Sequence, residues 1–207
     1  MRTYRDVRED AEAALRTVIL DAAGRILTGE GPASLTMRRI AAEVGCSTTV
    51  LYKVFQGKEG IADGLFREGF RRLLAELRGV PRNGSLLAWL DGLRWAYRNA
   101  ALSNPDYYQI MFASPIPSYK PSPEARELSR AALAVVADAA EAAMQAGVLE
   151  IGDPWAVAET LWAAAHGAVS LELAGYFSDP QTAVERFRQL TQATLNLFRT
   201  PGPHSLT

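Results

Sequence analysis

The sequence predicts an all-α protein of about nine helices, and three observations support this prediction. Alanine and leucine abound, runs of β-branched residues with period-two alternation are missing, and polar residues followed by proline recur as helix starts. Hydrophobic residues make up 48% and charged residues 22% of the 207 positions, as in a globular protein with a sizeable core. No apolar run is long enough to span a bilayer, so no membrane association is expected.

The first half of the chain divides into four expected helices. A helix over 7–27 is expected because apolar residues recur there at helical spacing. These residues are Leu15, Val18, Ile19, Ala22, Ala23 and Ile26. Glycine and proline at 29–32 end it, and helices over 36–44, 48–55 and 58–77 follow. The Gly/Pro-rich stretch at 79–84 marks the clearest boundary in the chain.

The second half is expected to hold helices over 85–103, 105–112, 123–146, 154–174 and 180–198. Four of them begin with a polar residue followed by proline, at Asn104, Ser122, Asp153 and Asp179. The polar side chain can cap an orphan N–H, and proline fits the first turn because no donor is needed there.

Residues 36–55 have the pattern of a helix–turn–helix. The inner faces would consist of Ile40, Ala41 and Val44 in the first helix and of Leu51, Val54 and Phe55 in the second. Gly45 between them supplies a turn conformation that a side chain resists, and Ala41 is small where the two helices cross. This order of residues predicts two short helices packed at an angle.

The outer face of the second short helix has the chemistry of a DNA contact surface. It offers Ser47, Thr48, Thr49, Tyr52 and Lys53, which can donate to phosphates or reach base edges in a major groove. Between residues 36 and 55, Arg38, Arg39 and Lys53 outnumber the single acid, Glu43. The local charge of +2 suits an anionic partner, although the whole chain carries −1. An ordinary helical corner with a solvated polar face is the alternative.

The motif Thr36-Met-Arg-Arg-Ile-Ala-Ala-Glu-Val-Gly-Cys-Ser, followed by Leu51-Tyr-Lys-Val-Phe and Lys58-Glu, resembles the DNA-binding domain of the tetracycline-repressor (TetR) family. The resemblance runs from about residue 12 to 70. It implies an all-α homodimer with an N-terminal DNA-binding headpiece, expected over 1–57, and a C-terminal ligand-binding and dimerisation bundle, expected over 58–207.

The resemblance also implies roles for single residues. Thr36 would cap the second helix and touch phosphate, Ser47 would open the recognition helix, and Tyr52 and Lys58 would contact the DNA backbone. The candidate DNA-binding residues are Thr36, Arg38, Ser47, Thr48, Thr49, Tyr52, Lys53 and Lys58. Cys46 and Val50 depart from the usual pattern, and Val50 offers a methyl contact to thymine in place of a polar one.

Two later features point to a small-molecule site. Aromatic and thioether side chains are concentrated between residues 89 and 112, and Trp162-Ala-Ala-Ala-His166-Gly167 resembles the Trp-x-x-x-His-Gly motif of one C-terminal subfamily. The candidate ligand-binding residues are Trp89, Tyr107, Tyr108, Met111, Phe112, Trp162 and His166. Packing in the helical core is the alternative for each of them. An apolar lining with few charges predicts a small hydrophobic or aromatic ligand.

Catalysis, cofactors and metal binding are not expected. His166 has no serine, cysteine or aspartate at a spacing that builds a triad on its helix. One cysteine and two distant histidines cannot form a zinc site within one chain. The single cysteine also fits a reducing compartment, and the charged residues 1–10 do not resemble a secretory signal, so a cytoplasmic location is expected.

The sequence therefore predicts a ligand-responsive transcriptional regulator, most often a repressor in this family. It is expected to bind double-stranded DNA at a palindromic operator as a homodimer, with helices 154–174 and 180–198 forming a four-helix interface. The alternative is a helical small-molecule-binding or enzymatic protein with an incidental helix–turn–helix.

Overall fold

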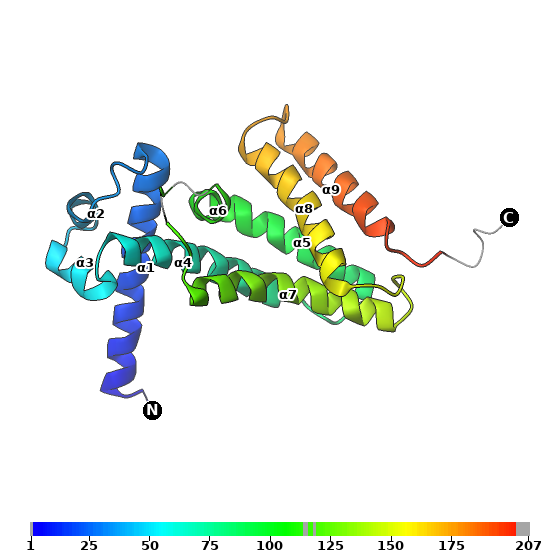
Figure 1. Ribbon diagram of the computed structural model, residues 1–207, viewed down its shortest axis with the longest axis horizontal. Coiled ribbons are helices and arrows are strands. Elements are labelled where there is room, and N and C mark those ends of the chain that lie inside the picture. Colours follow the sequence, from blue (N-terminus) through cyan, green and yellow to red (C-terminus); the bar gives the residue numbers. More distant parts are fainter. Residues whose placement is uncertain (1, 114–115, 118, 202–207) are drawn as a thin grey trace. The chain divides into compact units, whose positions relative to one another are not determined.

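The computed structural model describes residues 2–113, 116–117 and 119–201, and within these ranges it confirms the all-α prediction. Nine helices follow one another, and the only β-type pairing among the described residues is an isolated bridge between Leu149 and Arg199. The helices are α1 Tyr4–Glu30, α2 Met37–Val44, α3 Thr48–Phe55, α4 Lys58–Arg78, α5 Leu86–Ser103, α6 Pro105–Phe112, α7 Pro123–Gln145, α8 Pro154–Leu173 and α9 Pro180–Asn196 (Figure 1). In the described part, none of them is long and apolar enough to cross a membrane.

The chain divides into two compact units. The first unit comprises Met1–Arg71 and Asn104–Arg126, and the second comprises Arg72–Ser103 and Glu127–Thr207. The helix–turn–helix therefore packs together with α6 and with most of α4, which the sequence assigned to the C-terminal bundle. The functional division after residue 57 stays a prediction.

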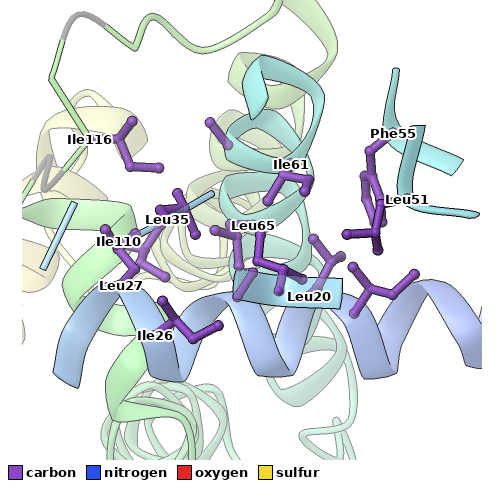
Figure 2. Packing of buried hydrophobic residues seen from close by; sticks show 14 of the residues in the cluster. Leu20, Ile26, Leu27, Leu35, Leu51, Phe55, Ile61, Leu65, Ile110 and Ile116 are labelled. Carbon is purple, nitrogen blue, oxygen red and sulfur yellow. The ribbon is translucent and has the colours of Figure 1, made fainter. Parts of the chain in front are cut away.

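The first unit is built around one apolar core (Figure 2). Its buried members include Leu20, Ile26, Leu27, Leu35, Leu51, Phe55, Ile61, Leu65, Ile110 and Ile116. These side chains come from α1, α3, α4 and α6 and from the segments before α2 and after α6. Because α3 contributes its Leu51 and Phe55 to the same core as α1 and α4, the orientation of α3 is fixed by packing from two longer helices.

The helix α1 differs from the expectation at both ends and on one face. It begins at Tyr4 because Thr3 and Asp6 form a capping box, in which Thr3 Oγ1 accepts from Asp6 N and Asp6 Oδ2 accepts from Thr3 N. Gly31, with φ 83°, lies just beyond its last residue, Glu30. Val18, expected in the buried stripe, is half exposed. At 100° per residue it falls outside the sector occupied by Ile19, Ala23 and Ile26.

Three of the four expected polar caps are present. Ser122 Oγ accepts from Ala125 N, and the carboxylates of Asp153 and Asp179 accept from backbone N–H groups in the first turns of α8 and α9. The expectation for Asn104 was wrong, because its side chain makes no cap hydrogen bond. Its ψ of 58° lies outside the extended region that Asp153 and Asp179 adopt at their caps.

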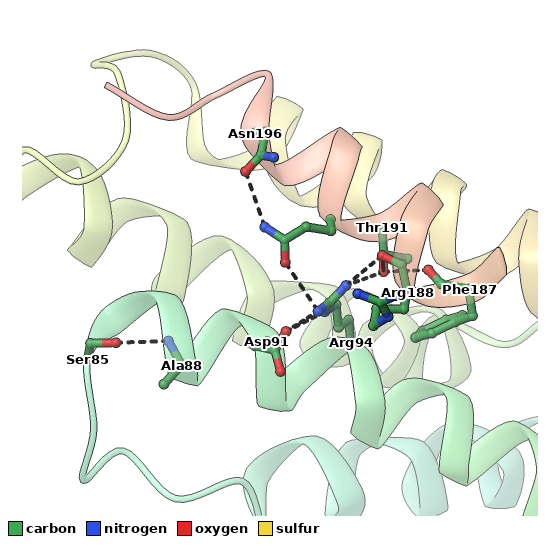
Figure 3. Close-up of polar contacts among 9 residues, drawn as sticks. Ser85, Ala88, Asp91, Arg94, Phe187, Arg188, Thr191 and Asn196 are labelled. Carbon is green, nitrogen blue, oxygen red and sulfur yellow. Dashed lines mark hydrogen bonds and ion pairs between the residues drawn. The ribbon is translucent and has the colours of Figure 1, made fainter. Parts of the chain in front are cut away.

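In the second unit, α8 and α9 lie side by side and α5 packs against α8 (Figure 1). Phe187 of α9 is fully buried, with its ring 5.1 Å from that of Trp95. Figure 3 shows Arg94 of α5 reaching α9, where its guanidinium donates to Thr191 Oγ1 at 2.6 Å and to the Arg188 carbonyl at 3.2 Å. Arg94 also pairs with Asp91 one turn away, so its charge is balanced.

Candidate functional site

The turn between α2 and α3 has the local geometry that the sequence predicts. Thr36 is extended (φ −120°) and its hydroxyl accepts from Arg39 N at 3.1 Å, which confirms it as the cap of α2. Gly45 ends α2 in the left-handed conformation, with φ 75° and ψ 32°. A side chain would resist this conformation, so glycine here shapes the turn.

The helix α3 separates into a buried and an exposed face. Leu51 and Phe55 are almost completely buried, whereas Ser47, Thr48, Thr49, Tyr52 and Lys53 are exposed. Ser47 is the residue before the first turn, yet its side chain makes no cap hydrogen bond. None of the hydrogen bonds described for this structure uses the side chains of these five residues, so their polar atoms are available to a partner.

The two arginines of α2 differ in availability. Arg39 donates to Glu30 at 2.6 Å and to Glu43 at 2.9 Å, and these hydrogen bonds raise the pKa of its guanidinium. Arg38 is exposed and forms no ion pair with any residue that the structure describes. Arg38 and Arg39 contribute equally to the local charge of +2 between residues 36 and 55. Of the two, only Arg38 has a guanidinium that is not already paired with a described carboxylate and can bind an anion.

Lys58 opens α4, the helix that follows α3 after two residues. Its ammonium donates to the Pro32 carbonyl at 3.4 Å and remains exposed. A lysine at a helix N-terminus adds its charge to the positive end of the helix dipole. This combination suits a phosphate contact.

Four of the candidate ligand residues lie on α6 in the first unit. Tyr107 donates its hydroxyl to Asp21 of α1 at 2.8 Å, and the rings of Tyr108 and Phe112 meet edge to face at 5.0 Å. Met111 lies against Gly69 of α4, where an added Cβ would be only 2.5 Å from the methionine sulfur. These contacts pack α6 tightly onto α1 and α4.

The other three candidate ligand residues, Trp89, Trp162 and His166, lie in the second unit. Trp162 and His166 contact the same hydroxyl group. Trp162 Nε1 donates to the hydroxyl of Tyr97 at 3.2 Å, and the same hydroxyl lies 3.0 Å from His166 Nδ1. Burial lowers the pKa of His166, which favours the neutral imidazole that can accept from Tyr97. Trp89 lies apart from this group, under the guanidinium of Arg82 at 4.3 Å.

The structure therefore brings the predicted ligand residues together in part. Tyr107, Tyr108, Met111 and Phe112 belong to one compact unit, whereas Trp89, Trp162 and His166 belong to the other. Tyr97 is a member of the second group that the candidate set missed, although the sequence placed it in the aromatic-rich stretch. Gly167 of the same motif has open space beside it, because no described atom beyond its chain neighbours and the backbone of its own helix lies within 4 Å of an added Cβ.

A short helix pair held by a larger core, with an exposed polar and cationic face, defines the class of helix–turn–helix DNA-binding proteins. Comparison with known families gives the same class. Residues 19–65 match the family model described as bacterial regulatory proteins of the tetR family, and residues 91–194 match the tetracyclin repressor-like C-terminal domain. The chain belongs to the TetR family and is a DNA-binding transcriptional regulator.

Relatives and solved structures agree along most of the chain. The helix–turn–helix transcriptional regulator Rv1816 of Mycobacterium tuberculosis is 24% identical over 91% of this chain and 95% of its own length. The regulatory protein SCO4313 has a similar crystal structure, with a TM-score of 0.75 and 26% identity over 91% of this chain and 98% of that one. A tetR-family protein from Rhodococcus RHA1, 20% identical over 91% of this chain and 98% of its own, shares the fold with a TM-score of 0.73.

Proposed function

We propose that this regulator is a repressor that binds a palindromic operator as a homodimer in the cytoplasm and is released by a small hydrophobic or aromatic ligand. The observation that carries the proposal is the exposed face of α3, where the side chains of Ser47, Thr48, Thr49, Tyr52 and Lys53 enter none of the described hydrogen bonds. Hydroxyl and ammonium groups on such a face can donate to phosphates and reach base edges in a major groove.

Within this face we assign two kinds of contact. Thr48 and Thr49, in the first turn of α3, are proposed to meet base edges, because the N-terminal residues of a recognition helix enter the major groove. The remaining candidate residues are proposed to contact the backbone phosphates. They are Ser47, Tyr52 and Lys53 on this face and the flanking Thr36, Arg38 and Lys58. The first kind gives sequence preference and the second gives affinity that falls with salt.

The proposed homodimer uses the outer face of α8 and α9. Leu171 of α8 and Leu190 of α9 are large apolar side chains that remain exposed in the single chain, and so does Leu197 just after α9. Apolar side chains concentrated on one pair of helices indicate a protein interface. A two-fold dimer doubles the number of base contacts and matches a palindromic site.

The proposed ligand response passes through α4. This helix has residues in both compact units, and only Gln56 and Gly57 separate it from α3. A ligand bound among the aromatic side chains would displace α4 and so change the separation of the two α3 helices in the dimer. Because the duplex fixes the half-site spacing, the coupling is expected to weaken operator binding about 5- to 150-fold.

Substitutions on α3 and α4 test the proposed contacts. Lys58→Ala is expected to weaken binding to all DNA sequences similarly and to lower the salt slope of log affinity by about one. Thr48→Ala and Thr49→Ala are expected to change the preference between operator variants, at a cost of about 1–3 kcal/mol for the preferred base. Lys120→Ala removes the same charge from an exposed loop position and serves as the control.

Fluorescence anisotropy with the upstream region of the regulator's own coding sequence, at several salt concentrations, measures both effects. If neither threonine variant changes affinity or preference, α3 does not read the bases. If no genomic fragment binds at all, the proposed contacts of α3 with an operator are wrong.

A second test addresses the ligand. A panel of phenols, aromatic carboxylic acids and alkyl-chain compounds is screened by thermal shift, and operator affinity is measured on the same samples. Trp162→Ala and Tyr108→Ala are expected to impair the response while DNA binding without ligand stays near normal. The exposed Tyr176→Ala serves as the aromatic control. Ligands that stabilise the protein without altering operator affinity would contradict the proposed coupling.

A further inference from the structure

The C-terminal end of α3 needs partners for its last carbonyl groups. The final four carbonyls of a helix have no N–H within the helix, and here Gln56 N satisfies that of Tyr52 at 2.9 Å. The carbonyl of Val54, two residues after Tyr52, accepts a hydrogen bond from another helix. Arg16 of α1 donates to it from Nη1 at 3.3 Å. A cation at this end also interacts favourably with the negative end of the helix dipole.

Arg16 holds the same turn of α3 at a second point. Its guanidinium carbon lies 4.4 Å from the centroid of the Phe55 ring, within the range of a cation–π contact. Phe55 is 3% exposed and belongs to the core of the first unit. One guanidinium therefore contacts both the backbone and the anchoring side chain of the last turn of α3.

The contact between Arg16 and Phe55 lies beside a glycine of α4. A Cβ on Gly64 would be 3.0 Å from Phe55 Cε1 and 3.5 Å from Arg16 Nη2. Burial and the nearby Arg67 lower the pKa of Arg16, while Glu68 and Asp63 of α4 oppose this shift. The side chain thus joins α1 to α3 beside α4, within one compact unit.

We propose that Arg16 is a positioning residue for DNA recognition: its guanidinium fixes the last turn of α3 against α1, so that the exposed face of α3 keeps one orientation in the groove. The proposal rests on α3 being the recognition helix. Arg16 acts through Val54 and Phe55 and makes no DNA contact itself. It differs in this respect from Arg38 and Lys58, which are proposed to bind phosphate.

Salt dependence separates positioning from direct contact. Arg16→Met keeps the apolar stem and removes the guanidinium, and it is expected to weaken operator binding roughly 10-fold, the loss typical of a hydrogen bond to a charged group. The salt slope is expected to stay unchanged because no phosphate contact is lost. Arg16→Lys, which keeps the charge and a donor without the planar group, is expected to recover part of the affinity.

The control is Arg5→Met, on the same helix. Arg5 pairs only with Glu9 in the described structure, and its side chain is 86% exposed, so this variant removes the same charge without touching α3. It is expected to bind the operator as the unmodified protein does. All measurements use the full-length protein below the onset of its thermal unfolding transition.

Three outcomes would overturn the proposal. A salt slope lowered by about one in Arg16→Met would show a direct phosphate contact. An unchanged affinity in Arg16→Met would show that the guanidinium does not position α3. A similar loss of operator affinity in Arg5→Met would show that the effect of Arg16→Met comes from the lower net charge alone.

If Arg16→Met does not fold, Phe55→Leu replaces it as the test variant, because it keeps the core apolar and removes the ring that Arg16 covers. The expected result is a loss of operator affinity of a few-fold in Phe55→Leu, and a smaller further loss on adding Arg16→Lys than Arg16→Lys causes by itself, since the two side chains are in contact. Additive losses would overturn the proposal. Failure of Thr48→Ala and Thr49→Ala to change DNA preference would instead contradict the proposed role of α3.

Discussion

Leu190→Asp is expected to convert the regulator into a monomer and to reduce operator affinity by roughly 100-fold or more, because each monomer keeps the contacts of only one half-site. Leu190 of α9 is 45% exposed in the single chain, and Leu171 of α8 is 46% exposed. A carboxylate buried at the centre of an apolar interface has no partner and opposes association. Leu171→Asp is expected to have the same effect.

Analytical ultracentrifugation at low micromolar concentration measures the dimer, and anisotropy on the same samples measures operator binding. Val7→Asp makes the same apolar-to-acidic change at an exposed position of α1, outside the proposed interface, and is expected to remain dimeric. Dimeric Leu190→Asp and Leu171→Asp proteins with ordinary operator affinity would show that α8 and α9 do not form the interface.

The sequence predicted local structure best where the signal lies within a few residues. The bounds of α3 match the expected 48–55, because a turn glycine precedes it and a short break follows it. The split between buried Leu51 and exposed Tyr52 follows from helical periodicity. The cap at Thr36, which the family resemblance implies, involves only the N–H of Arg39, three residues further on. Such features depend on neighbours along the chain and need no knowledge of the tertiary fold.

The features that sequence reasoning missed depend on partners distant in the sequence. The α6 residues Tyr107 and Met111 contact Asp21 and Gly69, so α6 belongs to the compact unit that holds the helix–turn–helix. Arg16 follows Leu15 in α1, and nothing in the neighbouring sequence indicates that its guanidinium reaches the Val54 carbonyl. Pairings across 38 to 86 residues require the fold itself.

The second large effect is expected at the ion pair between α5 and α8. Arg98 Nε donates to Glu172 Oε2 at 2.8 Å, and Arg98 Nη2 donates to the other carboxylate oxygen. The two side chains are only 10% and 13% exposed, and the guanidinium lies 5.9 Å from the ring of Phe187 in the core of the second unit. Little water reaches either charge in the native state.

Arg98→Met is therefore expected to lower the free energy of unfolding by about 3–5 kcal/mol, because it leaves the Glu172 carboxylate buried without its partner. The double variant Arg98→Met/Glu172→Leu is expected to recover most of that loss, since it replaces the pair by apolar side chains of similar volume. Urea unfolding at neutral pH, followed by circular dichroism, measures both.

The exposed pair of Arg5 and Glu9 provides the matched control, and Arg5→Met is expected to cost no more than about 1 kcal/mol. If Arg98→Met is as mild as Arg5→Met, water reaches Glu172 after the substitution and the site is less closed than its packing indicates. If the double variant is less stable than the single one, the unpaired Glu172 carboxylate is not the source of the loss. Either result would contradict the view that the large cost comes from one uncompensated buried charge.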